Sequence, residues 1–239
     1  IVSITSKDKQ DSLDFSSSAS ETTTTYEYDT EDKLKSAVGK TKSNGDDGFL
    51  NFYTGTTNHQ YSIINGQLKL QRNVTETNYD NADGSMSTAR GFVEYSYDDK
   101  NLLVDANGFT TTEGRDIFGS SFKIATVDKY VIVASQAKRD TTLSSNDSED
   151  IFGNITHSES FTKYVYNDSG ELIAAGGYTD TTGTDVFGNK FGTHTEHEYE
   201  IINGQPKVVR SDTGGNLLNP FSDLGDTIID LGDKLNNFL

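Results

Sequence analysis

Apolar and polar residues alternate along most of this chain. In the stretch "FVEYSYD", which starts at Phe92, the side chains of Val93, Tyr95 and Tyr97 share one face, while Glu94 and Ser96 share the other. A period of two with one apolar face is typical of a half-buried antiparallel strand. Thr, Tyr, Val and Ile, which fit a pleated surface, dominate these stretches. The pattern predicts an all-β fold.

The alternating stretches recur along the chain every 34 or 35 residues. One series of tyrosines runs Tyr26, Tyr61, Tyr95, Tyr130, Tyr164 and Tyr199. A second series runs Phe15, Phe49, Phe118, Phe152, Phe187 and Phe221, and Gly84 stands where one Phe is missing. A longer period of 69 residues relates Thr41, Thr110 and Thr179, as well as Gly45, Gly114 and Gly183. Such periods indicate a tandem repeat.

Each single repeat has the features of a long β-hairpin. Asn65-Gly66 and Asn203-Gly204 stand between alternating stretches, and Asn-Gly favours a tight hairpin turn because both residues accept positive φ. The hairpin "YVYNDSGELIAAGGYT" resembles one Tyr-Asp hairpin repeat of large secreted shell proteins, although the period here is longer. We therefore expect six long antiparallel β-hairpins, about 12 strands in three 69-residue double repeats, as one extended or curved sheet or a closed barrel.

The two ends of the chain depart from the repeat. Residues 1–20 are expected to form an N-terminal strand and a polar linker, and residues 21–218 the hairpin domain, with units 21–89, 90–158 and 159–218. Residues 219–239 are expected to form an amphipathic helix, because Phe221, Leu224, Ile228, Leu231, Leu235 and Phe238 are spaced three or four residues apart. The ends either cap the array or join it to a neighbouring molecule. The candidate assembly contacts are Val2, Ile4, Leu224, Ile228, Leu231 and Leu235.

The composition restricts the partners of the protein. A formal net charge of −17 argues against nucleic acid and anionic membranes, since no cationic stripe is present to meet phosphates. The absence of Cys excludes disulfides and thiolate metal sites, and no apolar run is long enough for a transmembrane segment. Only 32% of the residues are hydrophobic, which predicts a thin core. Abundant Thr, Ser, Asn, Asp, Gly and Tyr are typical of secreted or surface proteins of bacteria.

Catalytic motifs are missing from the sequence. It contains no G-x-S-x-G, no phosphate-binding loop and no strand-linked G-x-G-x-x-G. His194 and His197 are three residues apart, which places them on opposite faces of a strand and prevents them from sharing a metal ion. We do not expect an enzyme, although a secreted hydrolase is retained as a third hypothesis.

Calcium is the one cofactor that the sequence suggests. "NYDNADG" contains Asp80 and Asp83, and "SSNDSEDIFGN" contains Asp147 and Asp150. Their carboxylates are the hard oxygen ligands that Ca²⁺ requires. The alternative is that these residues form turns in which Asp and Asn bind their own backbone. Neither stretch matches an EF-hand loop.

The motif D-x-F-G recurs with the repeat, and we interpret it as a structural loop. In this motif, Gly supplies positive φ, Asp accepts hydrogen bonds from backbone amides, and Phe is expected to tuck under the loop and plug the end of the sheet. The first copy has Leu50 in place of Gly, so we expect its bend to differ. The loop residues are Asp47, Phe49, Asp116, Phe118, Gly119, Asp150, Phe152, Gly153, Asp185, Phe187 and Gly188.

These features favour a structural or adhesive role outside the cell. We expect an adhesin-like subunit of an extracellular filament, surface layer or matrix that assembles with copies of itself through its terminal segments. The alternative is a carbohydrate-binding module that contacts cell-surface polysaccharide through its Tyr-rich and Thr-rich strand faces.

Overall fold

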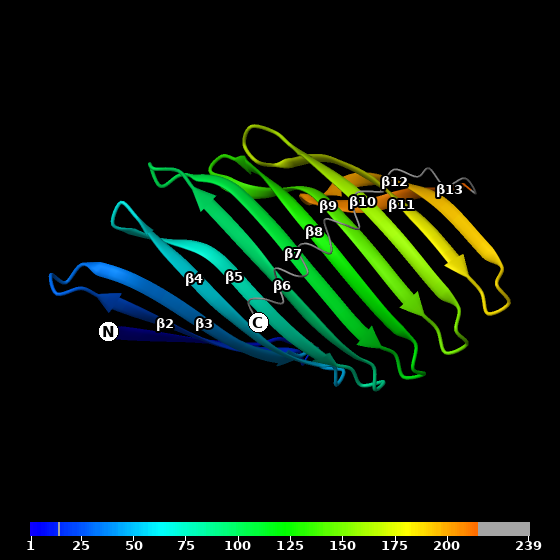
Figure 1. Cartoon of the computed structure of the whole chain (residues 1–239), viewed down its shortest axis with the longest axis horizontal. Helices are drawn as coiled ribbons and strands as arrows, with labels where there is room; N and C mark the ends of the chain where they lie inside the picture. The colour runs from blue at the N-terminus through cyan, green and yellow to red at the C-terminus, as the bar shows by residue number, and fades with distance from the viewer. Residues whose placement is uncertain (14, 215–239) are drawn as a thin grey trace.

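The computed structural model describes residues 1–13 and 15–214, and this part of the chain forms one open antiparallel β-sheet. Thirteen strands lie side by side in the order of the chain, from β1 at one edge to β13 at the other (Figure 1). The all-β prediction and the hairpin repeat are confirmed. The sheet is open, so the closed-barrel alternative is wrong, and it has 13 strands because the N-terminal segment contributes one more than the six hairpins.

The strands are long and similar in length. Their bounds are β1 Val2–Asp11, β2 Ser17–Tyr28, β3 Leu34–Asp46, β4 Phe52–Ile64, β5 Gln67–Asp80, β6 Met86–Tyr97, β7 Leu103–Arg115, β8 Ser121–Val133, β9 Gln136–Glu149, β10 Ile155–Tyr166, β11 Leu172–Thr184, β12 Lys190–Ile202 and β13 Gln205–Gly214.

The N-terminal boundary differs from the prediction. The polar stretch at the end of residues 1–20, expected to be a linker, enters β2 at Ser17. Its Ser and Thr side chains pair with β1 and β3 on both sides, so the neighbouring strands compensate for its lack of apolar residues. The predicted helix of residues 219–239 lies outside the described residues. Within the described part, no helix has the length and apolar character that a membrane crossing needs.

Tight turns at one end of the sheet behave as the sequence predicts. Asn65 and Gly66 have φ of 49° and 76°, and Asn203 and Gly204 have φ of 53° and 74°. Positive φ at both positions is the conformation of the two-residue turns that match strand twist. The Asn-Gly hairpin prediction is therefore confirmed at both sites.

The two faces of the sheet have different chemistry. On one face, seven consecutive strands, β5 to β11, contribute one apolar side chain each at the same level. We call these residues the apolar row: Val74, Phe92, Phe109, Val127, Leu143, Phe161 and Tyr178. Its centre is the hydrophobic core of the described chain, and Phe109 is only 1% exposed. The opposite face has a row of hydroxyl groups at nearly the same level.

Candidate interaction surfaces

A row of hydroxyl side chains crosses the whole sheet. It runs through directly paired positions on consecutive strands, and Gly91 on β6 is its only interruption. The hydroxyl row consists of Ser6, Thr22, Thr41, Thr57, Thr75, Thr110, Thr126, Ser144, Ser160, Thr179, Thr195 and Thr213. Neighbouring strands are about 4.8 Å apart, so the row presents hydroxyl groups at regular intervals along the long axis of the sheet.

Hydrogen bonds between the hydroxyl groups fix many members of the row. Thr22 and Thr41 lie 2.8 Å apart at their Oγ1 atoms, and Thr57 and Thr75 lie 2.9 Å apart. Similar contacts join Thr126 to Ser144, Ser160 to Thr179 and Thr195 to Thr213. Cross-strand Thr–Thr pairs stabilise a sheet and hold the side chains in defined rotamers. The hydroxyl row is therefore ordered in advance of any ligand.

Aromatic rings lie beside the hydroxyl row on the same face. Phe122 and Phe191 are opposite Gly114 and Gly183 on the preceding strands. An added Cβ at Gly183 would come within 2.1 Å of the Phe191 ring, so the ring covers the glycine closely. A third pair, Gly45 and Tyr53, repeats the arrangement. The 69-residue repeat therefore places three rings against three glycines at one side of the row.

His197 connects the hydroxyl row to the next row on the same face. Its Nε2 lies 3.0 Å from Oγ1 of Thr179, and its Nδ1 lies 2.9 Å from Oγ of Ser211. His59 makes the equivalent contacts with Thr41 and Asn73, both at 2.7 Å. Both histidines are thus used as hydrogen-bonding side chains that fix their neighbours.

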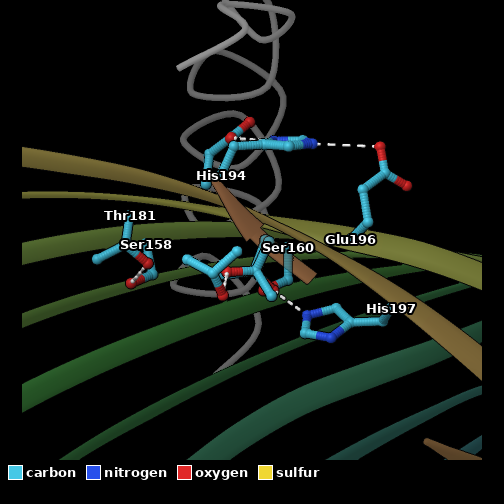
Figure 2. A network of polar contacts seen from close by, with 10 residues as sticks. Ser158, Ser160, Thr181, His194, Glu196 and His197 are labelled. Atoms are coloured by element: carbon cyan, nitrogen blue, oxygen red, sulfur yellow. Dashed lines mark hydrogen bonds and ion pairs between the residues drawn. The ribbon is translucent and has the colours of Figure 1, made fainter. Parts of the chain in front are cut away.

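His194 lies on the opposite face of β12 from His197 (Figure 2). Its Nδ1 is 2.6 Å from Oδ1 of Asp180, and its Nε2 is 3.2 Å from Oε1 of Glu196. A histidine ring donates from both nitrogens only when it is protonated. The hydrogen bonds to Asp180 and then Glu196 accordingly raise the pKa of His194 above its ordinary value. The site is an ion-paired cluster beside the apolar row.

The D-x-F-G turns lie at the other end of the sheet. Their Asp residues bind backbone amides and their Gly residues have positive φ, as the sequence predicts. Oδ1 of Asp185 accepts hydrogen bonds from the backbone N–H groups of Phe187 and Asn189, at 2.9 and 2.8 Å. Gly188 has φ of 83°. The side chain of Asn189 also donates to Asp185, at 2.7 Å. That bond and the two backbone bonds lower the pKa of Asp185, with the Asn189 side chain contributing most.

The phenylalanines of these turns are not tucked under the loops. Phe187 is 86% exposed, and its counterparts Phe49, Phe118 and Phe152 are each 73% exposed. The prediction that they plug the end of the sheet is wrong. The physical reason is that a single layer of strands provides no second layer at its end for a ring to enter. Large exposed apolar side chains in a line are typical of contact surfaces.

The first copy of the turn differs from the others in its backbone, as the sequence predicts. Leu50 stands where the other copies have Gly, yet its φ of 68° is the same left-handed conformation. Asp47 makes the same bonds to the backbone N–H groups of Phe49 and Asn51, at 2.8 and 3.3 Å. The bend nevertheless differs, because Gly48 also has a positive φ, of 79°, whereas Ile117, Ile151 and Val186 at the equivalent position do not. The left-handed conformation at Leu50 costs about 1–2 kcal/mol.

The four aspartates proposed for calcium lie in two separate places. Asp80 and Asp83 are at the end of β5 and in the turn after it, and Asp147 and Asp150 are at the end of β9 and in the turn after it. Oδ1 of Asp83 accepts a hydrogen bond from the Ser85 N–H. Within the described chain, no three His, Cys, Asp or Glu residues gather as a metal site.

The remaining exposed elements are the two edges of the sheet. All ten residues of β1 are exposed, and its outer backbone groups face no other strand of the described chain. Val2 is 51% exposed and Ile4 is 58% exposed. Both had been predicted as assembly contacts from the sequence, and both lie on this edge strand. The other candidates, Leu224, Ile228, Leu231 and Leu235, lie outside the described residues.

Sequence reasoning missed the hydroxyl row. The signal was present, because Thr41, Thr110 and Thr179 recur at a spacing of 69 residues. It could not be read as a row without the strand register, which aligns these residues with Ser and Thr from the intervening strands.

Comparisons of the chain with family models, with curated proteins and with solved structures find no match.

Proposed function

We propose that this protein is a structural or adhesive subunit that assembles with copies of itself through the free edge of β1. The observation that carries the proposal is the open sheet, whose first strand has ten exposed residues and an unpaired outer edge within the described chain. Such an edge is a template for pairing with another strand. In this role the protein acts outside a bacterial cell, in a filament, surface layer or matrix.

The number of strands favours a two-fold contact between β1 edges. Thirteen antiparallel strands make β1 and β13 run in the same direction. A head-to-tail contact between β13 and β1 of a translated copy would therefore pair parallel strands, which is slightly less stable per residue. A two-fold axis between two β1 strands gives antiparallel pairing and the self-complementary interface of most homodimers.

The sequence of β1 provides a suitable register for this contact. If Ser6 lies on the two-fold axis, Ser6 faces its own copy, and the hydroxyl row continues from one molecule into the next. Lys7 then faces Thr5 of the other copy instead of a second lysine. Like charges directly opposite each other are destabilising in a sheet, so this register avoids a repulsion that a register centred on Lys7 would create.

Analytical ultracentrifugation of the wild-type chain over a wide concentration range tests the proposal. We expect reversible association that Ile4→Asp weakens at least tenfold, because this residue would face Asp8 of the other copy in the register centred on Ser6, and like charges directly opposite each other are destabilising. The matched control is Val208→Asp on β13, where the native side chain is 53% exposed, and this change is expected to leave association unaltered. A wild-type protein that remains monomeric throughout, with or without Ca²⁺, would contradict the proposal.

The hydroxyl face favours a second candidate function, binding of an extended polysaccharide. The observation in its favour is the combination of pre-ordered hydroxyl groups with flanking rings such as Phe191, which is 51% exposed. A ring stacks on the apolar face of a sugar, while hydroxyl groups exchange hydrogen bonds with it. Co-sedimentation with insoluble polysaccharides tests this: binding should fall with Phe191→Ala and persist with Phe187→Ala. Absence of binding to any of them would remove this candidate.

A further inference from the structure

The apolar row is a surface that a single-layer sheet does not explain. Strand side chains stand roughly perpendicular to the sheet. Side chains on neighbouring strands therefore cover the sides of each side chain in the row, and only a second layer of structure covers its tip. On the hydroxyl face, the buried apolar residues are small, such as Ala37 and Ala106. On the other face, by contrast, the rings of Phe92 and Phe109 are 4% and 1% exposed. Burial of such large side chains requires a cover.

The rings of the apolar row already contact one another along the sheet. The centroids of Phe92 and Phe109 are 6.0 Å apart, and those of Phe161 and Tyr178 are 5.7 Å apart. The guanidinium of Arg72 lies 4.3 Å from the ring centroid of Phe92, at one end of the row. These contacts make a continuous apolar strip, which is the surface that an amphipathic helix requires.

The sequence beyond the described residues contains one segment with the matching pattern. From Phe221 to Phe238, six apolar residues follow the three- and four-residue spacing of a helix face. Asp223, Asp226, Asp230 and Asp233 fall between them. Gly225 and Gly232 each disfavour an isolated helix by about 1 kcal/mol, so a helix with this sequence would need an apolar partner.

The dimensions of the segment and of the row agree. Residues 221–238 span about 27 Å as a helix, at about 1.5 Å per residue. The row from β5 to β11 crosses six inter-strand spacings of about 4.8 Å, or about 29 Å. A helix of that length would therefore match the row from end to end.

The chain also leaves the sheet at the correct place. Asp212 on β13 pairs with Glu196 on β12, and Glu196 pairs with Tyr178 of the apolar row on β11. Asp212 therefore lies at the same level of the sheet as the row. The described chain ends two residues later, at Gly214. Residues 215–220 reach up to about 20 Å when extended, and β11 lies two strand spacings, or about 10 Å, away. The connection is long enough without strain.

We propose that residues 221–238 lie along the apolar row of their own sheet and form its second layer. The occupant of the row is thus a segment of the same chain. This inference does not rest on the proposed function, because it concerns the face of the sheet and not the β1 edge. It assigns Leu224, Ile228, Leu231 and Leu235 to an intramolecular contact, and leaves Val2 and Ile4 for assembly.

A single tryptophan tests the proposal, since the native chain contains none. We compare Leu231→Trp, in the apolar series, with Asp233→Trp, which lies two residues further on and therefore on the opposite side of the predicted helix. The Leu231→Trp protein should show blue-shifted emission and several-fold weaker acrylamide quenching than the Asp233→Trp protein. Equal exposure of both tryptophans would overturn the proposal. Shielding that disappears on dilution would also overturn it, since the cover would then be a second copy.

A second pair of changes tests the surface itself. In the Leu231→Trp background, Phe161→Asp is expected to restore strong quenching, because a carboxylate enters the apolar row. Thr162→Asp, at the next position on the opposite face, is expected to preserve shielding. Far-UV circular dichroism confirms that the sheet is retained in both variants. If Phe161→Asp unfolds the sheet, Tyr178→Asp at the end of the row replaces it.

Shielding that survives the change in the row would contradict the inference. Ile4→Asp should leave the shielding intact, which separates this result from the assembly experiment.

Discussion

The two faces of the sheet are built by the same strands, yet they are stabilised in different ways. Phe109 and Thr110 are neighbours on β7, and one belongs to the apolar row while the other belongs to the hydroxyl row. On the apolar face, burial of large side chains provides the free energy. On the hydroxyl face, cross-strand hydrogen bonds and close glycine contacts fix the geometry. The sheet therefore concentrates its hydrophobic stabilisation on one face and carries its row of hydroxyl groups on the other.

The largest effect is expected when the apolar row is interrupted. Phe109→Ala should lower the free energy of unfolding by about 3–5 kcal/mol, since it removes a fully buried ring and leaves a cavity. Thr110→Ala, at the next residue, is the matched control and should cost about 1 kcal/mol or less. Urea unfolding followed by circular dichroism measures both. Similar losses for the two variants would show that the faces contribute equally.

An intermediate effect is expected from two adjacent glycines on β11. An added Cβ at Gly177 would lie 2.2 Å from the backbone oxygen of Phe161, whereas one at Gly176 meets nothing within 4 Å. Gly177→Ala should therefore destabilise the protein by about 1–3 kcal/mol, because backbone atoms have to move. Gly176→Ala should be neutral or stabilising, since it reduces the entropy of the unfolded chain.

Thermal melting distinguishes these two glycine variants. If Gly176→Ala lowers the melting temperature as much as Gly177→Ala does, the hydroxyl face has no special requirement for glycine. The comparison of the faces would then rest on side-chain polarity alone.

The contrast between the faces also explains what the sequence could and could not predict. Alternation around Val93 and Tyr95 was enough for strands and hairpins, because period two is a local property. The polar stretch at the end of residues 1–20 is predicted to be a linker, since its Ser and Thr residues show no apolar face. The structure pairs that stretch on both sides within a hydroxyl-rich part of the sheet.

The turns show the same limit of sequence reasoning. Positive φ at Gly188 and the backbone bonds of Asp185 are local, and the sequence predicts both correctly. The position of Phe187 depends on whether a second layer exists at that end of the sheet, and it proved exposed. The hydroxyl row depends on the register of 13 strands, which no single repeat specifies.

A smaller effect is expected when one hydroxyl pair is changed. Thr57→Val leaves the Thr75 hydroxyl without its 2.9 Å partner, and should cost about 1 kcal/mol. The double variant Thr57→Val/Thr75→Val should be no less stable than the single one, because no unpaired hydroxyl remains. Denaturant titration of four proteins, the wild type, Thr57→Val, Thr75→Val and the double variant, forms a double-mutant cycle. Additive losses would show that the hydroxyl groups act independently and that the row is not a coupled unit.

The smallest effect concerns the pH dependence of the cluster beside the apolar row. Asp180 and Glu196 raise the pKa of His194 above the ordinary value of 6.5. For His157, burial lowers the pKa, but Asp147 and Glu159 outweigh it, so the pKa is also raised. A histidine whose pKa is higher in the folded state stabilises that state fully below about pH 6.5, and this contribution is lost as the pH rises through the folded value.

Histidine titration by NMR and melting between about pH 5.5 and 8.5, on either side of the ordinary histidine pKa, measure this effect together. We expect His194 to titrate above 6.5, and Asp180→Asn to lower that midpoint, since Asp180 is its nearest carboxylate at 2.6 Å. The double variant His194→Gln/His157→Gln should show a smaller fall in melting temperature with rising pH than the wild type. Subtracting one pH profile from the other removes the pH dependence that the remaining charged groups of the chain cause in both proteins. A His194 midpoint at or below 6.5 would mean that the hydrogen bonds to Asp180 and Glu196 do not hold the proton in solution. The apolar face would then gain its stability from the buried row alone, without a charged cluster at its side.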